Sequence, residues 1–224
     1  AGLIFGNVSV VFVCRSGEQQ VWSMYPQLQP DGKSLRRWGK IHDGEVLAGA
    51  GEGVYAAEGN KCYLAVAGGR LQLRNMTTGT LRWEGEAPAG SIRQVAFSGN
   101  YDRFTALSAD GKLHRWSIED HHPESSWGAF FGKIWYEGAT GPDYTWQSSS
   151  GSDEFEAKYS MMPLIYGTAK GTFFALLFAL PIALTAAIYV SQFLRPEYRN
   201  VVKPVMEIMA SLPSVVLGFL AGLW

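Results

Sequence analysis

The feature that most constrains this chain is an uncharged run of 24 residues, Gly171–Leu194. Folded as an α-helix with a rise of about 1.5 Å per residue, the run covers roughly 36 Å, enough to cross a hydrocarbon core of about 30 Å. Lys170 precedes it and Arg195 follows it. The sequence therefore predicts a transmembrane helix, and everything before the helix lies on one side of the membrane.

Small side chains recur at every fourth position through this run, which places them on one ridge of the helix. They are Gly167, Gly171, Ala175, Ala179, Ala183, Ala187 and Ser191. Such a ridge lets a neighbouring helix approach closely in lipid. We expect the helix to pack inside a bundle, although an Ala-rich apolar helix can give this spacing by chance. Pro181 lies in mid-span, where we expect a kink.

The distribution of charged residues divides the chain into two parts. Residues 1–158 contain 15 Lys or Arg and 18 Asp or Glu, whereas residues 159–224 contain four and two. The net charge of −1 excludes a strongly basic nucleic-acid-binding protein. Because the chain begins without Met and stops inside the apolar run Gly218–Trp224, we expect it to be a piece of a longer protein.

Residues 1–118 alternate between β-rich segments and turns that contain Gly, Asn or Asp. The predicted strands are Val8–Cys14, Val21–Tyr25, Gly53–Ala57, Cys62–Ala67, Leu71–Arg74, Leu81–Trp83, Ile92–Ser98, Phe104–Ser108 and Leu113–Ile118. A turn followed by basic residues, Leu and often Trp recurs from Asp31, Gly68 and Asp110, a period near 40 residues. This period predicts about three WD-like blades of a partial β-propeller. An irregular β-sandwich is the alternative.

The β-rich part lacks the sequence motifs of an enzyme. It contains no HExxH, CxxC, phosphate-binding lysine loop or GxSxG, and we assign no catalytic residue, metal site or cofactor. The adjacent His121 and His122 would point to opposite faces of an extended chain, so they are poor joint ligands. Cys14 and Cys62 could form a disulfide in an oxidising compartment, but two separate buried thiols are the favoured interpretation.

Residues 119–158 form a connector that is rich in Gly, Ser and acidic residues and also carries many aromatic rings. They are Trp127, Phe130, Phe131, Trp135, Tyr136, Tyr144 and Trp146. A free linker would not carry so many rings. Either Ser126–Tyr136 forms a short helix at the membrane–water interface, or the rings pack beneath the β-rich domain.

After the first helix, the sequence predicts a short polar loop over residues 195–204 and a second helix over about 205–224. Because Arg195, Arg199 and Lys203 make the loop basic, the positive-inside rule places it in the cytoplasm. Residues 1–158 are then outside, in the periplasm of a Gram-negative cell. In the second helix, Gly218 and Gly222 have the spacing of a close-packing motif, and Pro213 predicts a kink. We expect Glu207 to lie at the membrane interface, near the N-terminus of this helix.

Residues 163–224 resemble the membrane part of the permease subunit of phosphate-specific ABC importers, the PstC type. The matching stretches are PLIYGTAKGTFFALLFALPIALTAAIYVSQF and KPVMEIMASLPSVVLGFLAGLW. The connector sequences FFGKIWYEG and PDYTWQSSS are similar to the segment before this helix in large Gram-negative members, which carry an extra periplasmic domain. The resemblance implies that residues 159–224 begin a type-1 transmembrane domain of an ABC importer. Residues 1–118 would then be part of the periplasmic domain.

The resemblance also implies a multi-pass protein of the bacterial inner membrane. Its partners would be a second permease subunit, ATP-binding subunits that carry out ATP hydrolysis, a periplasmic phosphate-binding protein and membrane lipid. The chain itself would perform no chemistry, and its phosphate-contacting residues stay unknown. Two other functions remain open: a permease for another oxyanion such as molybdate or sulfate, and a membrane-anchored sensor or scaffold that binds a protein.

Overall fold

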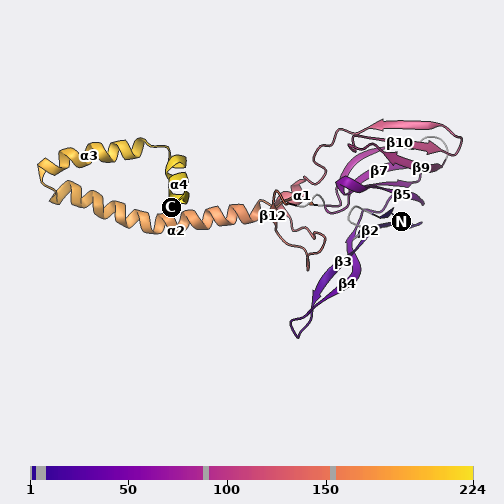
Figure 1. Cartoon of the computed structure of the whole chain (residues 1–224), viewed down its shortest axis with the longest axis horizontal. Coiled ribbons are helices and arrows are strands. Elements are labelled where there is room, and N and C mark those ends of the chain that lie inside the picture. Colours follow the sequence, from indigo (N-terminus) through magenta and orange to yellow (C-terminus); the bar gives the residue numbers. More distant parts are fainter. Residues whose placement is uncertain (1, 4–8, 88–90, 152–154, 224) are drawn as a thin grey trace. The chain divides into compact units, whose positions relative to one another are not determined.

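The computed structural model of the chain describes all residues except 1, 4–8, 88–90, 152–154 and 224 (Figure 1). It divides into a β-rich unit, Ala1–Tyr166, and a helical unit, Gly167–Trp224. The order of a β-rich part followed by helices agrees with the sequence prediction.

Most strands of the β-rich unit form three antiparallel sheets, in each of which the strands follow one another in chain order. The first sheet is β1 (Gly2–Leu3), β2 (Ser9–Val13), β3 (Gln19–Leu28) and β4 (Ser34–Asp43). The second is β5 (Gly51–Ala57), β6 (Cys62–Ala67), β7 (Arg70–Asn75) and β8 (Leu81–Glu86). The third is β9 (Ile92–Phe97), β10 (Arg103–Ser108) and β11 (Leu113–Ser117). A short 3₁₀ turn, Glu58–Asn60, separates β5 from β6.

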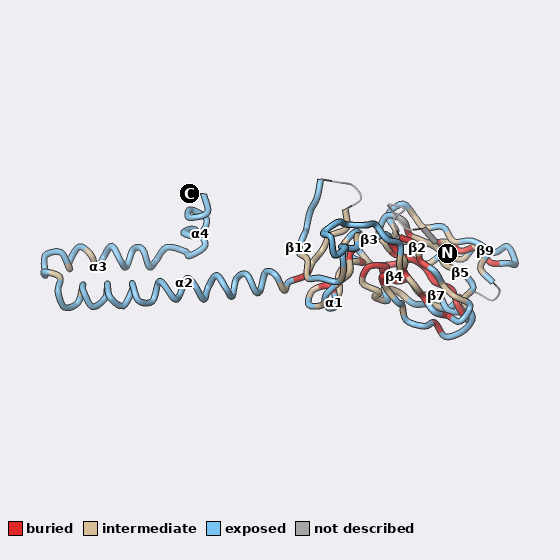
Figure 2. Tube along the Cα trace, turned by 90° about the horizontal axis from the view of Figure 1, so that it is seen from below, coloured by how far each residue is buried: buried red, intermediate tan, exposed pale blue. Residues whose placement is uncertain are grey.

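The second sheet lies between the other two, and its strand β6 is buried along its whole length. The buried residues lie mainly among the strands of the β-rich unit (Figure 2). Alternate side chains of β6 enter different cores. Tyr63, Ala65 and Ala67 pack with residues of the first sheet such as Val11 and Val21. Cys62, Leu64 and Val66 pack with Phe104 of the third sheet. The uninterrupted apolar sequence of β6 is therefore that of a strand covered on both faces.

Successive sheets meet along their first strands, because β1 and β2 lie beside β5, and β5 lies beside β9. Each sheet is a simple meander, as the repeat predicted. These three sheets do not close into a ring, so the described part of the chain does not contain a closed propeller.

The turns of the β-rich unit largely follow the sequence prediction, but the phase of the repeat differs. Gly68 and Gly69 join β6 to β7 with positive φ angles of 57° and 77°, as a two-residue type I′ turn requires. The repeats that begin at Gly68 and Asp110 both lead into the third strand of a sheet. The repeat that begins at Asp31 instead leads into β4, the fourth strand of its sheet.

The strand β4 was not predicted. Its first five residues are exposed, and its sequence SLRRWGKIHD lacks an apolar alternation. β4 forms because it pairs with β3 from Gln20↔Asp43 to Leu28↔Ser34. The two strands make a long hairpin that projects from the first sheet (Figure 1).

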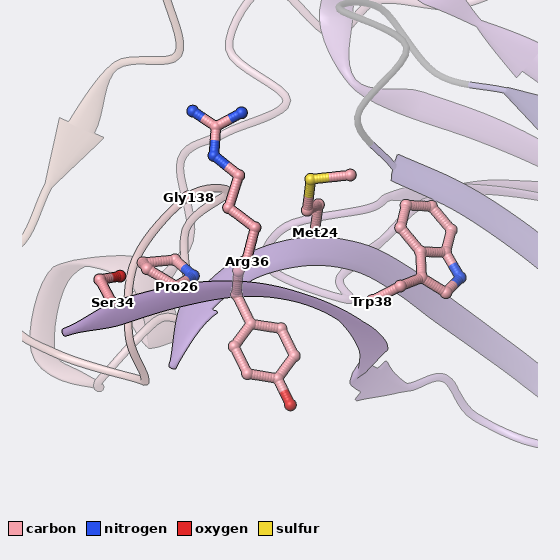
Figure 3. Close-up of a pocket in the computed structure, with 7 residues that line it drawn as sticks. Met24, Pro26, Ser34, Arg36, Trp38 and Gly138 are labelled. Carbon is pink, nitrogen blue, oxygen red and sulfur yellow. The ribbon is translucent and has the colours of Figure 1, made fainter. Parts of the chain in front are cut away.

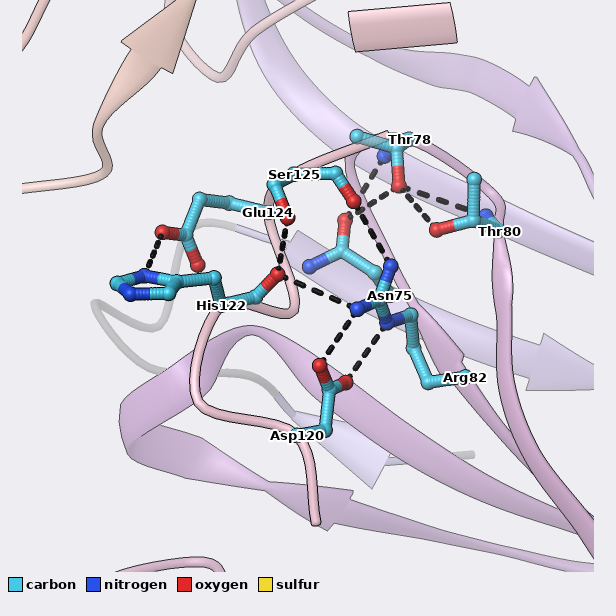
Figure 4. Close-up of polar contacts among 8 residues, drawn as sticks. All are labelled: Asn75, Thr78, Thr80, Arg82, Asp120, His122, Glu124 and Ser125. Atoms are coloured by element: carbon cyan, nitrogen blue, oxygen red, sulfur yellow. Dashed lines mark hydrogen bonds and ion pairs between the residues drawn. The ribbon is translucent and has the colours of Figure 1, made fainter. Parts of the chain in front are cut away.

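The connector is attached to the sheets by charged side chains (Figure 4). Arg82 of β8 donates to Asp120 Oδ2 at 2.7 Å, to the Ser125 carbonyl at 2.8 Å and to the His122 carbonyl at 3.3 Å. Lys61 pairs with Glu137, and both side chains are nearly buried. The connector is thus part of the folded unit.

One of the predicted connector rings packs against the first sheet, a second is buried, and others stay exposed. Trp135 contacts Tyr25 edge to face at 5.2 Å, and Tyr136 is buried. Trp127, Phe131 and Trp146 are exposed. The connector also contains α1 (Trp127–Phe131), β12 (Trp146–Gln147) and β13 (Lys158–Tyr159), which pairs with β12. Packing against the β-rich domain is therefore confirmed for Trp135, whereas the position of the exposed rings at the membrane interface stays a prediction.

Both cysteines are free. Cys62 is buried at the start of β6, and burial raises the pKa of its thiol to about 12. Cys14 is half-buried, directly after β2. Two separate thiols were the favoured prediction.

Glu156 makes the stability of the β-rich unit depend on pH. Burial raises its carboxyl pKa from 4.5, and Glu137 adds to the rise, whereas Thr77, Lys61 and Lys158 oppose it. A raised folded-state pKa means that the native state holds the proton more tightly than the unfolded chain. The contribution of Glu156 to stability is therefore fully present below about pH 4.5 and is lost as the pH rises through the folded-state pKa. We expect Glu156→Gln to remove this loss and to raise Tm at pH 7.

Thermal unfolding of both proteins between pH 4 and pH 8 measures this effect. Glu119→Gln, which removes an exposed carboxylate, is the control for the loss of one negative charge. Equal Tm changes for the two variants at every pH would contradict the assignment to Glu156.

The helical unit contains most of one long helix and two shorter ones. α2 (Met162–Ile188) continues into a π-helical turn, Tyr189–Phe193. α3 (Pro196–Ser211) and α4 (Ser214–Leu223) follow. The combined helix Met162–Phe193 is long and apolar enough to cross a membrane. Taken together, α3 and α4 are also long and apolar enough to form one membrane span, which is bent by 90° at the break between the two helices.

The predicted loop 195–204 is therefore mostly helical, because α3 begins at Pro196. Its charged residues suggested a loop, but Pro at the first position of a helix has a preset φ angle and no N–H to satisfy. Pro204 lies inside α3. The short connection between α2 and α3 is Leu194–Arg195.

Candidate functional site

The helical unit contains a groove between the C-terminal half of α2 and the neighbouring face of α3. Its volume is about 750 Å³. On the α2 side it is lined by Ala183, Ala186, Ala187, Val190 and Ser191, and on the α3 side by Arg199, Val202, Lys203, Met206 and Glu207. We call it the α2–α3 groove.

The α2 wall of the groove consists largely of the predicted small-residue ridge. Ala183, Ala187 and Ser191 of the ridge line it. The earlier ridge positions lie outside the groove. A Cβ atom added at Gly167 or Gly171 would meet nothing within 4 Å among the described atoms. The N-terminal half of the ridge is thus open in this structure, and its packing against another helix stays a prediction.

The α3 wall carries three charged residues at four-residue spacing, Arg199, Lys203 and Glu207. This spacing places them on one face of a helix. Arg199 donates from Nε to the Val190 carbonyl at 3.1 Å, and its guanidinium also binds the Ser191 carbonyl. These carbonyls lie in the last turns before the chain reverses, where no further helical N–H groups are available. Arg199 therefore joins the end of one helix to the start of the next.

The sequence placed these charges differently. Arg195, Arg199 and Lys203 were assigned to a loop, and Glu207 to the N-terminal end of a second helix. In the structure Arg195 immediately precedes α3, and the other three share its face toward α2. The spacing of 199, 203 and 207 was the available signal, and the loop assignment obscured it.

The two prolines predicted as kinks have different surroundings. Pro181 lies inside the continuous helix α2, where Thr185 Oγ1 donates to its carbonyl at 2.9 Å and to that of Ile182 at 3.0 Å. Pro213 lies in the break between α3 and α4. Gly218 and Gly222 lie on α4, and a Cβ at either would meet nothing within 4 Å among the described atoms.

A second hollow, of about 610 Å³, lies on the β3–β4 hairpin (Figure 3). Met24 and Trp38 are directly paired across the strands, and so are Pro26 and Arg36. These four side chains share one face, with Gly138 of the connector nearby. Met24 and Trp38 are exposed. This surface was not predicted from the sequence, because the strand β4 was not predicted.

The described residues offer no cluster of three or more His, Cys, Asp or Glu that could hold a metal ion. His121 and His122 are both exposed, and His122 Nδ1 faces Glu124 at 3.2 Å. The α2–α3 groove is lined by small and apolar side chains together with three charged ones, and Arg199 links its two walls.

The comparisons with known proteins each cover only part of the chain. No protein-family model matches the chain. The probable ABC transporter permease protein YqgH of Bacillus subtilis (strain 168) is 32% identical over 65 residues, 29% of this chain and 21% of that protein. The matched part thus spans about a fifth of that relative's length. A structure of Kluyveromyces lactis Hsv2p has a TM-score of 0.39 at 17% identity, covering 55% of this chain and 38% of that one. That score is too low to support an argument about the fold.

Proposed function

We propose that this chain is part of a membrane-spanning permease subunit of an ABC importer. The observation that carries the proposal is the similarity over 65 residues to an ABC transporter permease. A helix long enough to span a membrane, followed closely by a second helix that turns back along it, agrees with a multi-helix permease. The subunit would form part of a path through the membrane, while separate subunits bind and hydrolyse ATP.

The proposed cargo is inorganic phosphate. Its support is the resemblance of PLIYGTAKGTFFALLFALPIALTAAIYVSQF and of the Glu207-to-Ser214 step to the phosphate-specific permeases. The partners would be a second permease subunit and a phosphate-binding protein on the side of residues 1–158. Arg195, Arg199 and Lys203, the basic residues that follow the first helix, support a cytoplasmic position for this end of the helix. The β-rich unit before the helix would then be periplasmic.

For the β-rich unit, we propose that the three sheets are blade-like repeats of a larger propeller. Their common meander order and the adjacency of β1, β5 and β9 support this proposal. In a propeller, the first strands of neighbouring blades line the central channel.

Uptake of labelled phosphate at low external phosphate tests the proposal. The assay uses a bacterial strain from which the full-length gene has been deleted and which has no other active phosphate uptake system. We expect uptake to be lost, and to return with the intact gene but not with a copy lacking the coding region for residues 162–224. Unchanged uptake in the deletion strain would contradict phosphate transport. Competition by molybdate and sulfate in the restored strain distinguishes phosphate from another oxyanion.

A second candidate function, a membrane-anchored scaffold for a protein partner, is favoured by the exposed Met24 and Trp38 on the β3–β4 hairpin. Met24→Ser with Trp38→Ser separates the two functions. A scaffold that acts through this surface would lose its partner in the double variant, whereas a permease would keep transporting.

A further inference from the structure

We propose that the short helix α1 lies at the membrane surface, with Trp127 and Phe131 inserted among the lipid headgroups beside the first turn of α2. The inference rests on the proposed membrane location of α2. It names a lipid contact made by the β-rich unit itself, outside the spanning helix.

The first observation is the shape of α1. The helix is capped by Ser126, whose Oγ accepts from the Ala129 N–H at 3.0 Å, and Ala129 is buried. The opposite side carries Trp127, which is 81% exposed, and Phe131, which is 46% exposed. Their rings stack at 5.8 Å with planes 14° apart. The helix therefore holds two large apolar rings outward as one block.

The second observation is the position of α1 beside the start of the spanning helix. The Met161 N–H donates to the Phe130 carbonyl at 2.8 Å, and α1 also contacts β13. Met161 immediately precedes α2. Figures 1 and 2 both place α1 and β12 at the end of the β-rich unit where α2 begins. Leu164, Ile165 and Tyr166, which follow this contact at the start of α2, are exposed as well.

The length of the spanning helix sets the depth of this junction. The 32 residues Met162–Phe193 cover about 48 Å at 1.5 Å per residue. A bilayer with its headgroups is about 40–45 Å thick, and spanning helices tilt by about 20° on average. Such a tilt reduces the span to about 45 Å, so the first turn of α2 reaches the headgroup layer. α1, which is bonded to the preceding residue, lies at the same level.

The chemistry of α1 and its surroundings suits this layer. Trp is enriched at membrane–water interfaces because its ring is apolar and its N–H is polar. Trp146, exposed on β12, adds a second Trp that contacts Tyr159 at 5.9 Å. The exposed Lys133 follows α1 and can pair with lipid phosphates. A lipid surface is therefore the occupant that these side chains fit.

Site-specific fluorescence in proteoliposomes tests the proposal on the full chain. An environment-sensitive fluorophore is attached at Trp127→Cys, or at Phe131→Cys, in a Cys14→Ser background. Cys62 stays unlabelled because it is buried and its thiol pKa is about 12. The matched control is Leu113→Cys. Leu113 is apolar and 72% exposed, and it begins β11, at the end of that strand away from the connector.

We expect a blue-shifted emission at position 127 that is quenched by lipids brominated near the headgroup and protected from aqueous iodide. The control at position 113 should be quenched by iodide and not by the brominated lipids. If the label at 127 behaves like the control, α1 lies in water and the proposal is wrong. If neither quencher reaches it, protein covers α1 and the proposal is equally wrong.

Carbonate extraction of the same vesicles separates this inference from the proposed function. If the chain is extracted from the bilayer, both the lipid contact of α1 and the proposed permease function are rejected. If the chain stays in the bilayer and the label at position 127 contacts lipid, but the gene supports no phosphate uptake in cells, only the proposed transport function is rejected.

Discussion

Phe104→Ala is expected to lower the free energy of unfolding of the β-rich unit by about 3–5 kcal/mol, the usual cost of deleting a buried Phe side chain. Phe104 is 1% exposed on β10 and packs in the core between the second and third sheets. It stacks on Trp116 at 4.9 Å and meets Trp83 edge to face at 5.4 Å. The substitution leaves a cavity and removes these ring contacts.

This loss is a large share of the 5–15 kcal/mol that stabilises a typical domain, so the β-rich unit would be largely unfolded at elevated temperature. Near-UV circular dichroism during urea unfolding of the detergent-solubilised chain measures the change. The control is Phe12→Ala. Phe12 is 37% exposed on β2 and has one edge contact with Trp22. We expect a cost of at most about 1 kcal/mol for the control, because little apolar area is lost. Equal costs for the two variants would show that Phe104 is not in a packed core.

Ala183→Trp is expected to force α2 and α3 apart. Ala183 lines the α2–α3 groove, and its small side chain leaves room for the face of α3 that carries Arg199 and Lys203. Adding bulk to a close helix contact costs about 1–3 kcal/mol, equivalent to roughly 5–150-fold in the population of the paired form. Arg199 would also lose its bonds to the carbonyls of Val190 and Ser191.

Crosslinking in the membrane measures helix pairing. Cysteines introduced at Ala186 and Val202, which line the two sides of the groove, should be joined by a short bismaleimide in the parent chain. We expect Ala183→Trp to reduce this product strongly. Ile188→Trp is the control, since Ile188 is 55% exposed on α2 and lies outside the groove. Undiminished crosslinking in Ala183→Trp would reject the groove as a helix contact. Normal recovery of the partner permease with that variant would reject the ridge as an assembly surface.

The amino-acid sequence alone was sufficient for features whose cause is local. The long apolar helix Met162–Phe193 follows from an uncharged run of 24 residues, Gly171–Leu194. The β6 strand follows from its unbroken apolar sequence, and its turn to β7 follows from two adjacent glycines that tolerate positive φ. These features depend on residues within one window of the chain, so composition and spacing are enough to identify them.

Only the tertiary structure decided the features that depend on distant partners. β4 is a strand because β3 supplies its hydrogen bonds, although its exposed, charged residues show no apolar period. Residues 196–204 are helical, and Arg199 lies on the face that meets α2, where it binds carbonyl groups near the end of that helix. The connector rings divide between a sheet and an exposed surface according to what lies beside them. A charged or aromatic side chain has favourable positions in both buried and exposed sites. Whether such a side chain is buried or exposed therefore depends on which distant residues the fold places beside it, and the neighbouring sequence does not identify those residues.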